Sequence, residues 1–148
     1  WKDSDKKGKV YRMRLDLLVN NFVYKAINDK YIVLFEGNFK RNYIHVRDVA
    51  LAFLHCINNF SNMKNEIYNL GLEEANLSKK ELCEKIKKYV NFFYHEEDFE
   101  KDEDQRNYIV SNKKILNTGY NPKFSIDFGI EELIKGYEGI NLRSFKNY

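Results

Sequence analysis

The sequence predicts an α/β fold. Short apolar runs of high β-propensity, such as Tyr31–Phe35, alternate with segments whose apolar residues recur every three to four positions. With 148 residues the chain is long enough for one hydrophobic core, and an aromatic content of 16% excludes a disordered tail. Strands that alternate with helices in this way are typical of α/β proteins.

The first predicted elements follow a polar, irregular stretch at Trp1–Tyr11. Apolar residues at i and i+4 predict a helix from Leu17 to Asn28, and Tyr31–Phe35 then forms a strand closed by a glycine. Tyr43–Val46 predicts a second strand. His45 would point away from its apolar neighbours in that strand, and we expect it to have a structural role.

The middle of the chain predicts a second helix and a third strand. Asp48 stands at an N-cap position ahead of a helical apolar stripe, and Ile67–Leu70 forms a short strand stopped by Gly71. Ser78 and Glu81 have the spacing of a capping box, in which each side chain satisfies a backbone N–H of the other residue. They open a further helix, whose buried face is predicted to hold Leu82, Cys83, Ile86 and Val90.

The last third of the chain predicts two strands and two helices. Phe92–Tyr94 is a candidate strand, followed by an acidic loop over residues 96–104. Tyr108–Val110 predicts another strand, after which Ser111 caps a short helix. Gly119 suits the left-handed position after that helix, Pro122 prevents its continuation, and an amphipathic helix follows over residues 126–137.

Composition excludes several classes of protein. The net charge of +3 comes from mixed charges of both signs, which argues against a nucleic-acid binder. No apolar run approaches the roughly 18 residues that a membrane span needs, so we expect no membrane partner. Cys56 and Cys83 are far apart on helical faces and are predicted to be reduced core residues of a cytoplasmic protein.

The sequence contains no motif that by itself forms a complete active site. None of the glycines has the spacing of a phosphate-binding loop, and the three histidines have no metal-ligand spacing with each other or with a cysteine. Because the chain begins at Trp1 rather than Met, we expect a fragment or the product of a broken gene. Arg41, Arg47 and Arg106 flank predicted strands. An arginine there can recognise phosphate, but for a single arginine, judged from the residues alone, a solvated strand end is the favoured interpretation.

Five motifs, in order, resemble those of the extended short-chain dehydrogenase/reductases that act on nucleotide sugars. They are Arg12-Met-Arg-Leu-Asp, Arg41-Asn-Tyr-Ile-His-Val-Arg-Asp, Ile67-Tyr-Asn-Leu-Gly, Asn76-Leu-Ser, and Asp104-Gln-Arg-Asn-Tyr with the following Ser111-Asn-Lys-Lys and Gly119-Tyr. The resemblance covers about residues 12–137, and is greatest to bacterial enzymes acting on nucleotide-linked heptoses or 6-deoxyhexoses. It implies that residues 12–148 are the substrate-binding half of a Rossmann-type domain, with the last strand and helices of the cofactor domain.

Two motifs of that family are absent. There is no G-x-x-G-x-x-G, which holds the pyrophosphate of NAD(P) at a helix N-terminus, and none of the 11 tyrosines has a lysine four positions later. The resemblance therefore implies no catalytic residue and no bound cofactor in this chain alone. It implies NAD or NADP, and a homodimer, for a full-length parent enzyme.

The resemblance also implies which residues bind a nucleotide-diphosphate sugar. Arg41 and Arg106 match two arginines that contact the nucleotide from opposite sides. Val33 and Phe35 match a strand that lies against the base, although an ordinary core strand fits them equally. Asn20, or its neighbour Asn21, matches a position lining the same pocket, although an ordinary polar surface residue is the favoured interpretation of both. The predicted function is the nucleotide-sugar-binding part of an epimerase, dehydratase or reductase; the alternative is a non-catalytic binding or interaction module.

Overall fold

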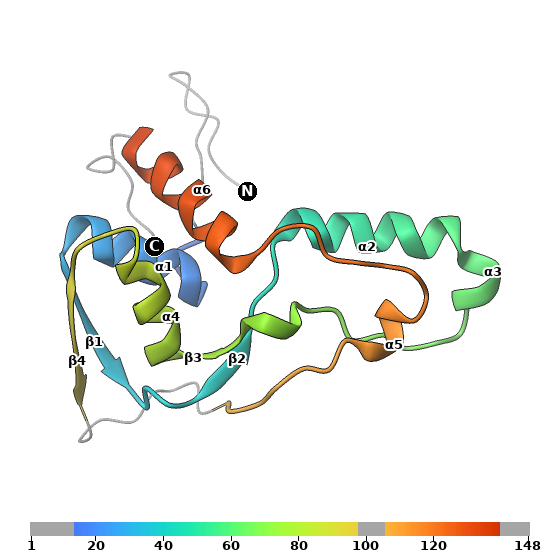
Figure 1. Ribbon diagram of the computed structural model, residues 1–148, viewed down its shortest axis with the longest axis horizontal. Helices are drawn as coiled ribbons and strands as arrows, with labels where there is room; N and C mark the ends of the chain where they lie inside the picture. The colour runs from blue at the N-terminus through green and yellow to red at the C-terminus, as the bar shows by residue number, and fades with distance from the viewer. Residues whose placement is uncertain (1–13, 98–105, 140–148) are drawn as a thin grey trace, which may run out of the picture.

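The computed structural model describes residues 14–97 and 106–139, which form an α/β fold (Figure 1). The predicted class is confirmed. The predicted irregular stretch 1–11 and residues 98–104 of the predicted acidic loop lie outside the described residues. In chain order the elements are α1 (Leu18–Asn28), β1 (Tyr31–Phe35), β2 (Lys40–Asn42), α2 (Val46–Asn58), α3 (Phe60–Met63), the 3-10 turn η1 (Glu73–Ala75), β3 (Asn76–Ser78), α4 (Lys79–Lys87), β4 (Phe93–Glu97), α5 (Lys113–Leu116) and α6 (Ile126–Gly139).

Two small sheets organise these elements. Strands β1 and β4 run parallel, with Tyr31 opposite Phe93, and β2 pairs antiparallel with β3. A parallel pair needs a crossover connection, and here that connection holds β2, α2, β3 and α4. Alternate residues of β1 point to opposite faces: Ile32 and Leu34 are buried, whereas Tyr31 and Val33 are exposed.

The apolar core is divided between the two ends of the molecule. The larger cluster joins β1 to α1, α4 and α6, and includes Val23, Leu82 and Ile130, none of which is exposed. A smaller cluster at the other end joins α2, α3 and α5 through Ala52, Met63 and Ile115 together with Tyr120. Figure 1 shows β1 and β4 at one end and α3 at the opposite end, with α2 running from the centre to α3.

The second strand lies earlier than predicted. It comprises Lys40–Asn42, and the chain leaves the sheet after Tyr43, whose N–H donates to the carbonyl of Ala75. His45 is then the N-cap of α2, because its Nδ1 accepts a hydrogen bond from the N–H of Arg47 at 3.2 Å. The predictions of a strand at Tyr43–Val46 and of a helix cap at Asp48 are therefore wrong: the imidazole supplies the cap.

Two other predicted strands are not strands. Tyr108–Val110 lies beside β2, but only the N–H of Tyr108 bonds to the carbonyl of Lys40; the N–H of Val110 donates instead to the side chain of Asn76, at 2.8 Å. Ile67–Leu70 has no backbone–backbone hydrogen bond to any other described segment. A strand is defined by a ladder of backbone hydrogen bonds to a neighbouring strand. A segment of suitable sequence that lacks this ladder remains irregular.

The predicted helix boundaries are largely confirmed. The capping box is present, with the N–H of Glu81 donating to Ser78 Oγ at 3.1 Å and the N–H of Ser78 donating to Glu81 Oε2 at 2.7 Å. Gly119 has the predicted left-handed conformation, with φ of 88°. The N-cap of α5 is Asn112 rather than Ser111, and its side chain makes no capping hydrogen bond.

Candidate functional site

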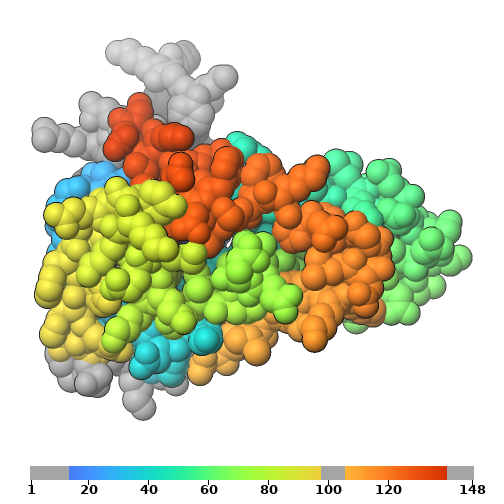
Figure 2. Space-filling model, viewed as in Figure 1, coloured from blue at the N-terminus to red at the C-terminus, as the bar shows by residue number. Residues whose placement is uncertain are grey.

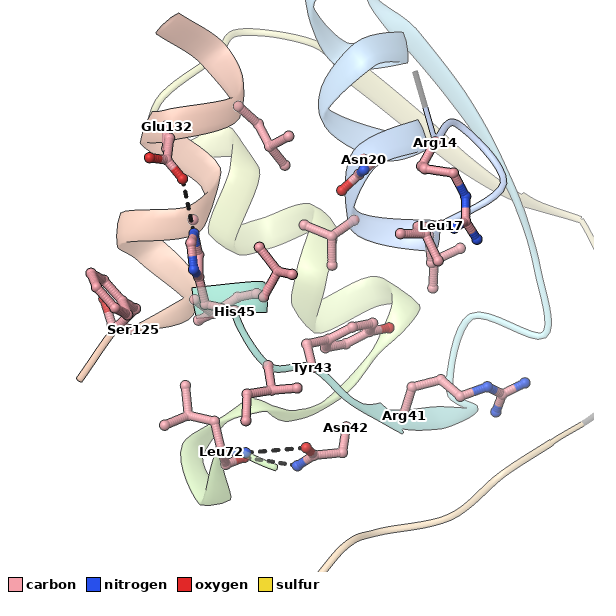
Figure 3. Close-up of a pocket in the computed structure, with 18 of the residues that line it drawn as sticks. Arg14, Leu17, Asn20, Arg41, Asn42, Tyr43, His45, Leu72, Ser125 and Glu132 are labelled. Carbon is pink, nitrogen blue, oxygen red and sulfur yellow. Dashed lines mark hydrogen bonds and ion pairs between the residues drawn. The ribbon is translucent and has the colours of Figure 1, made fainter. Parts of the chain in front are cut away.

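A cavity of about 880 Å³ lies between the start of α1, the β2–α2 connection and the first half of α6 (Figure 3). The segment that follows residue 105 closes a further side through Arg106 and Tyr108. Ligand sites in proteins commonly have volumes of roughly 300–1,000 Å³, so the cavity is large enough for a nucleotide-sized molecule.

The cavity wall carries more basic than acidic side chains. Arg14, Arg41, Lys79 and Arg106 line it, and Arg14 forms a two-pronged ion pair with Asp16, with Nε–Oδ1 and Nη2–Oδ2 distances of 2.8 and 2.7 Å. In Figure 3, Arg14 and Arg41 lie at one end of the cavity. Glu132 of α6 and His45 of the β2–α2 connection lie at the other end. A concave wall of net positive charge favours an anionic ligand.

Arg41 is the most enclosed of the arginines at this end, with 7% of its surface exposed. It is the middle residue of β2, and strand alternation turns its side chain inward while the flanking residues are only half-buried. Its Nη1 donates to the carbonyl of Lys40 at 3.0 Å, and its Cζ lies 5.6 Å from the ring centre of Tyr108. Stacking on an aromatic ring holds the planar guanidinium in one orientation, which suits two-pronged recognition of phosphate.

Tyr43 adds a buried hydroxyl to the same wall. No group of the described residues hydrogen-bonds its Oη, although that atom is inaccessible to solvent. Burial raises the pKa of the Tyr43 phenol well above its usual range, against the opposing effect of Arg41, so the hydroxyl stays neutral. A buried hydroxyl without a partner is costly, so Tyr43 leaves an unsatisfied hydrogen-bonding group in this wall.

Lys79 is the first residue of α4 and only 3% exposed. Its Nζ donates to the carbonyl of Phe35 at 2.7 Å, which ties the end of β1 to the start of α4. Lys79 thus lines the cavity and links two elements of the fold.

The opposite end of the cavity is built around His45 and Glu132. His45 Nδ1 accepts from the N–H of Arg47, so Nε2 carries the hydrogen and donates to Glu132 Oε2 at 2.9 Å. This hydrogen bond lowers the pKa of Glu132, and the nearby Arg47, which also pairs with Glu132, lowers it further. The His45 ring also lies with its centre 4.9 Å from that of Phe124, so its position in the cavity wall is held by packing as well as by hydrogen bonds.

Asp48 holds the loop that completes this wall. The side chain is fully buried, and its two oxygens accept from the N–H groups of Lys123 and Phe124 at 2.8 and 3.0 Å. Its backbone carbonyl accepts from the hydroxyl of Tyr120 at 2.6 Å. The residue is structural, as predicted, but it anchors residues 123–124 beside the cavity instead of capping its own helix.

The structure brings three of the five sequence-predicted site residues to the cavity. Arg41, Arg106 and Asn20 line it. Val33 and Phe35 lie on β1 and are not among the lining residues, and Val33 is on the exposed face of the strand. Contact of these two with a nucleotide base stays a prediction.

Sequence reasoning did not identify the other polar groups of the cavity. They include Arg14, Tyr43, Lys79 and Glu132. Tyr43 could have been found, because it lies two positions after Arg41, but the predicted strand placed it on the wrong element. Lys79 looks like any polar residue of a first helical turn, and only the structure shows that it is buried.

Two further findings concern the described residues only. Among residues 14–97 and 106–139, no group of three or more His, Cys, Asp or Glu side chains is placed to hold a metal ion. No helix in this part of the chain is long and apolar enough to cross a membrane.

The described residues combine an α/β fold with a basic cavity. Residues 5–71 match the family model described as the NAD dependent epimerase/dehydratase family. The matched segment includes Arg41 and the capped start of α2.

Solved structures share the fold. RMD from Pseudomonas aeruginosa, complexed with NADPH, matches with a TM-score of 0.68 and 16% identity over 85% of this chain and 44% of that chain. UDP-glucose 4-epimerase of Thermotoga maritima with UDP-glucose matches with a TM-score of 0.67 and 20% identity, over 91% of this chain and 41% of that chain. ADP-L-glycero-D-manno-heptose-6-epimerase of Helicobacter pylori matches with a TM-score of 0.62 and 24% identity, over 83% of this chain and 38% of that chain. The present chain therefore spans about two fifths of the length of these proteins.

Proposed function

We propose that the chain is the nucleotide-sugar-binding portion of an NAD(P)-dependent nucleotide-sugar epimerase, dehydratase or reductase. The observation that carries this proposal is the position of Arg41, enclosed in the cavity wall and stacked on Tyr108, with Arg106 lining the same space. Two arginines beside one cavity suit a diphosphate, since each charge-assisted hydrogen bond contributes about 1.5–3 kcal/mol.

The rest of the cavity suits the sugar end of such a ligand. In this proposal the diphosphate lies near Arg41 and Arg106, and the neutral hydroxyl of Tyr43 bonds a phosphate or sugar oxygen. A heptose or 6-deoxyhexose is the sugar that the sequence resemblance favours. UDP-glucose and an ADP-heptose appear in the names of the solved relatives.

The described residues do not fit the pyrophosphate of a dinucleotide. The sequence has no G-x-x-G-x-x-G, and no described helix begins at a glycine-rich turn. We therefore place the NAD(P) site in another portion of a parent enzyme, which we propose to be cytoplasmic and dimeric. This chain alone would bind the substrate and leave hydride and proton transfer to that portion.

A second candidate is a binding module without catalysis. It is favoured by one observation: no tyrosine of the sequence has a lysine four positions later, so the proton-transfer pair of the family is missing from the chain itself. Both candidates bind a nucleotide and differ in whether a catalytic portion exists.

The test is calorimetric titration of the 148-residue chain with ADP, GDP, UDP, CDP and dTDP. We expect one of them to bind with a dissociation constant between micromolar and millimolar, and Arg41→Ala to weaken binding by roughly 10–100-fold. Lys88→Ala is the matched control, because it removes one positive charge from a residue that does not line the cavity. Equal weakening in both variants would reduce the effect to net charge and contradict the proposed role of Arg41.

A further inference from the structure

The segment of residues 106–110 forms one side of the cavity without being a regular element. It carries Arg106 and Tyr108, which line the cavity, and none of its residues belongs to a helix or a strand. Tyr108 and Ile109 are 42% and 71% exposed, so apolar packing does little to hold the segment. Figure 2 shows it, in light orange, at the surface next to β2, in cyan. Its position therefore depends on the polar contacts that it makes with its neighbours.

Strand β2 holds only the first half of this segment. The N–H of Tyr108 donates to the carbonyl of Lys40 at 3.1 Å, and the N–H of Lys40 donates to Asn107 Oδ1 at 2.9 Å. No backbone–backbone hydrogen bond joins Ile109 or Val110 to another of the described residues. The second half of the segment is therefore held by a different kind of partner.

The side chain of Asn76 is that partner. Asn76 is the first residue of β3, and its Oδ1 accepts from the N–H of Val110 at 2.8 Å. Its Nδ2 donates to the carbonyl of the same Val110 at 3.0 Å. Opposed residues of an antiparallel ladder exchange these same two hydrogen bonds. The carboxamide can take the place of a backbone neighbour because, like a peptide group, it has both a donor and an acceptor.

The carboxamide of Asn76 is itself fixed by two further hydrogen bonds. Its Nδ2 also donates to the carbonyl of Glu73 at 3.1 Å, and its Oδ1 also accepts from Asn42 Nδ2 at 3.0 Å. Both hydrogens and both lone pairs of the group are then used, which allows it only one orientation. Asn76 thus joins η1 and β2 to the segment of residues 106–110.

We propose that Asn76 is a positioning residue for the binding of a nucleoside diphosphate, because it holds the segment that carries Arg106 and Tyr108. Asn76 does not line the cavity, so it acts only through that segment. The effect extends to Arg41, whose Cζ lies 5.6 Å from the ring centre of Tyr108. The inference rests on the proposed function for the identity of the ligand.

The first test compares two asparagine variants by calorimetric titration with ADP, GDP, UDP, CDP and dTDP. Asn76→Ala removes both hydrogen bonds to Val110 and should weaken binding at least about fivefold. Asn59→Ala is the matched control, because Asn59 is also half-buried, donates from Nδ2 to the carbonyl of His55 at 2.9 Å, and does not line the cavity. It should change binding less than about twofold. Equal weakening in the two variants would reduce the effect to lost stability and overturn the proposal.

Amide hydrogen exchange tests the contact between Asn76 and Val110 without a ligand. In Asn76→Ala the amide of Val110 should exchange at least about 10-fold faster, since it loses the oxygen to which it donates. Unchanged exchange would overturn the proposal, and so would faster exchange with unchanged nucleotide binding. Failure of the unmodified chain to bind any of the nucleotides would contradict the proposed function, whereas the exchange at Val110 judges the contact itself.

A conservative variant separates positioning from a purely structural role. In Asn76→Asp the ionised carboxylate can accept from the N–H of Val110 but has no hydrogen to donate to the carbonyls of Val110 and Glu73; protonation restores a donor. Relative to the unmodified chain, the dissociation constant of this variant should fall at least about threefold from about pH 7 to about pH 4. Asn59→Asp places the same charge away from the cavity and should show no such fall. A parallel fall in both variants would reduce the effect to charge and overturn the proposal.

Discussion

Replacing Asp48 by alanine tests whether a buried carboxylate holds one wall of the cavity in place. The side chain is fully buried and accepts two backbone hydrogen bonds, from the N–H groups of Lys123 and Phe124. A hydrogen bond to a charged group contributes about 1.5–3 kcal/mol, and an N–H left unsatisfied in a buried place costs about 1–3 kcal/mol. Burial of the carboxylate itself offsets part of the gain. We expect Asp48→Ala to lower the free energy of unfolding by about 3–5 kcal/mol.

Urea denaturation followed by far-ultraviolet circular dichroism measures this loss. The midpoint should fall while the dependence on urea concentration stays the same, because the surface exposed on unfolding is unchanged. Asp29→Ala is the control, since Asp29 is exposed and should alter the free energy of unfolding by less than about 0.5 kcal/mol. Tyr120→Phe removes only the bond to the Asp48 carbonyl and should cost about 1 kcal/mol. A loss below about 1 kcal/mol for Asp48→Ala would show that water satisfies the two N–H groups, and would refute the reasoning.

Two further predictions concern a close contact and a pH dependence. In Gly71→Ala the new Cβ would collide with Asn42 Oδ1, so the variant should lose about 1–3 kcal/mol in the same denaturation assay. Gly136→Ala, in α6 with nothing near its Cβ position, should instead gain up to about 1 kcal/mol; equal effects of the two would contradict the steric argument. The pKa of Glu132 is lowered in the folded state by its hydrogen bond from His45, so its stabilising effect is complete above the ordinary carboxyl pKa of about 4.3 and is lost as the pH falls through the lowered value. Between about pH 5 and 3, Glu132→Gln should therefore show a shallower fall of the melting temperature than the unmodified chain, and parallel curves would exclude a role for this carboxylate.

Local signals in the sequence were sufficient for most helices. The capping box of Ser78 and Glu81 and the left-handed Gly119 depend on a few adjacent residues, and the structure has both. The helix of residues 126–137 was predicted from its apolar period and is present as α6. Elements whose stability is decided within one or two turns can be read in this way.

The strands were harder to predict because pairing is not a local property. Tyr43–Val46 has the β-propensity of a strand, yet His45 caps α2 and ends the pairing at Asn42. Tyr108–Val110 lies beside β2, but the N–H of Val110 donates to the side chain of Asn76 rather than to a backbone carbonyl. No propensity scale contains this information.

The residues of the candidate site were likewise predicted where a local motif marks them and missed where only long-range packing does. Arg41 and Arg106 were found through their family motifs, and both line the cavity. Tyr43 and Lys79 were missed. They matter because they are buried beside the cavity, and the cavity is enclosed by segments that are distant in the sequence. Asp48 was recognised as structural, but its partners are 75 and 76 residues away in the chain.

The contact between α1 and α6 has a consequence for how the chain matures on the ribosome. The hydroxyl of Tyr137 donates to the carbonyl of Asn20, and Tyr137 packs against Tyr24 with ring centres 5.8 Å apart. Residues more than 110 positions apart thus close the larger core. During synthesis the apolar face of α1 cannot pack against α6 until more than 110 further residues have been made, so the nascent chain exposes that face over this interval.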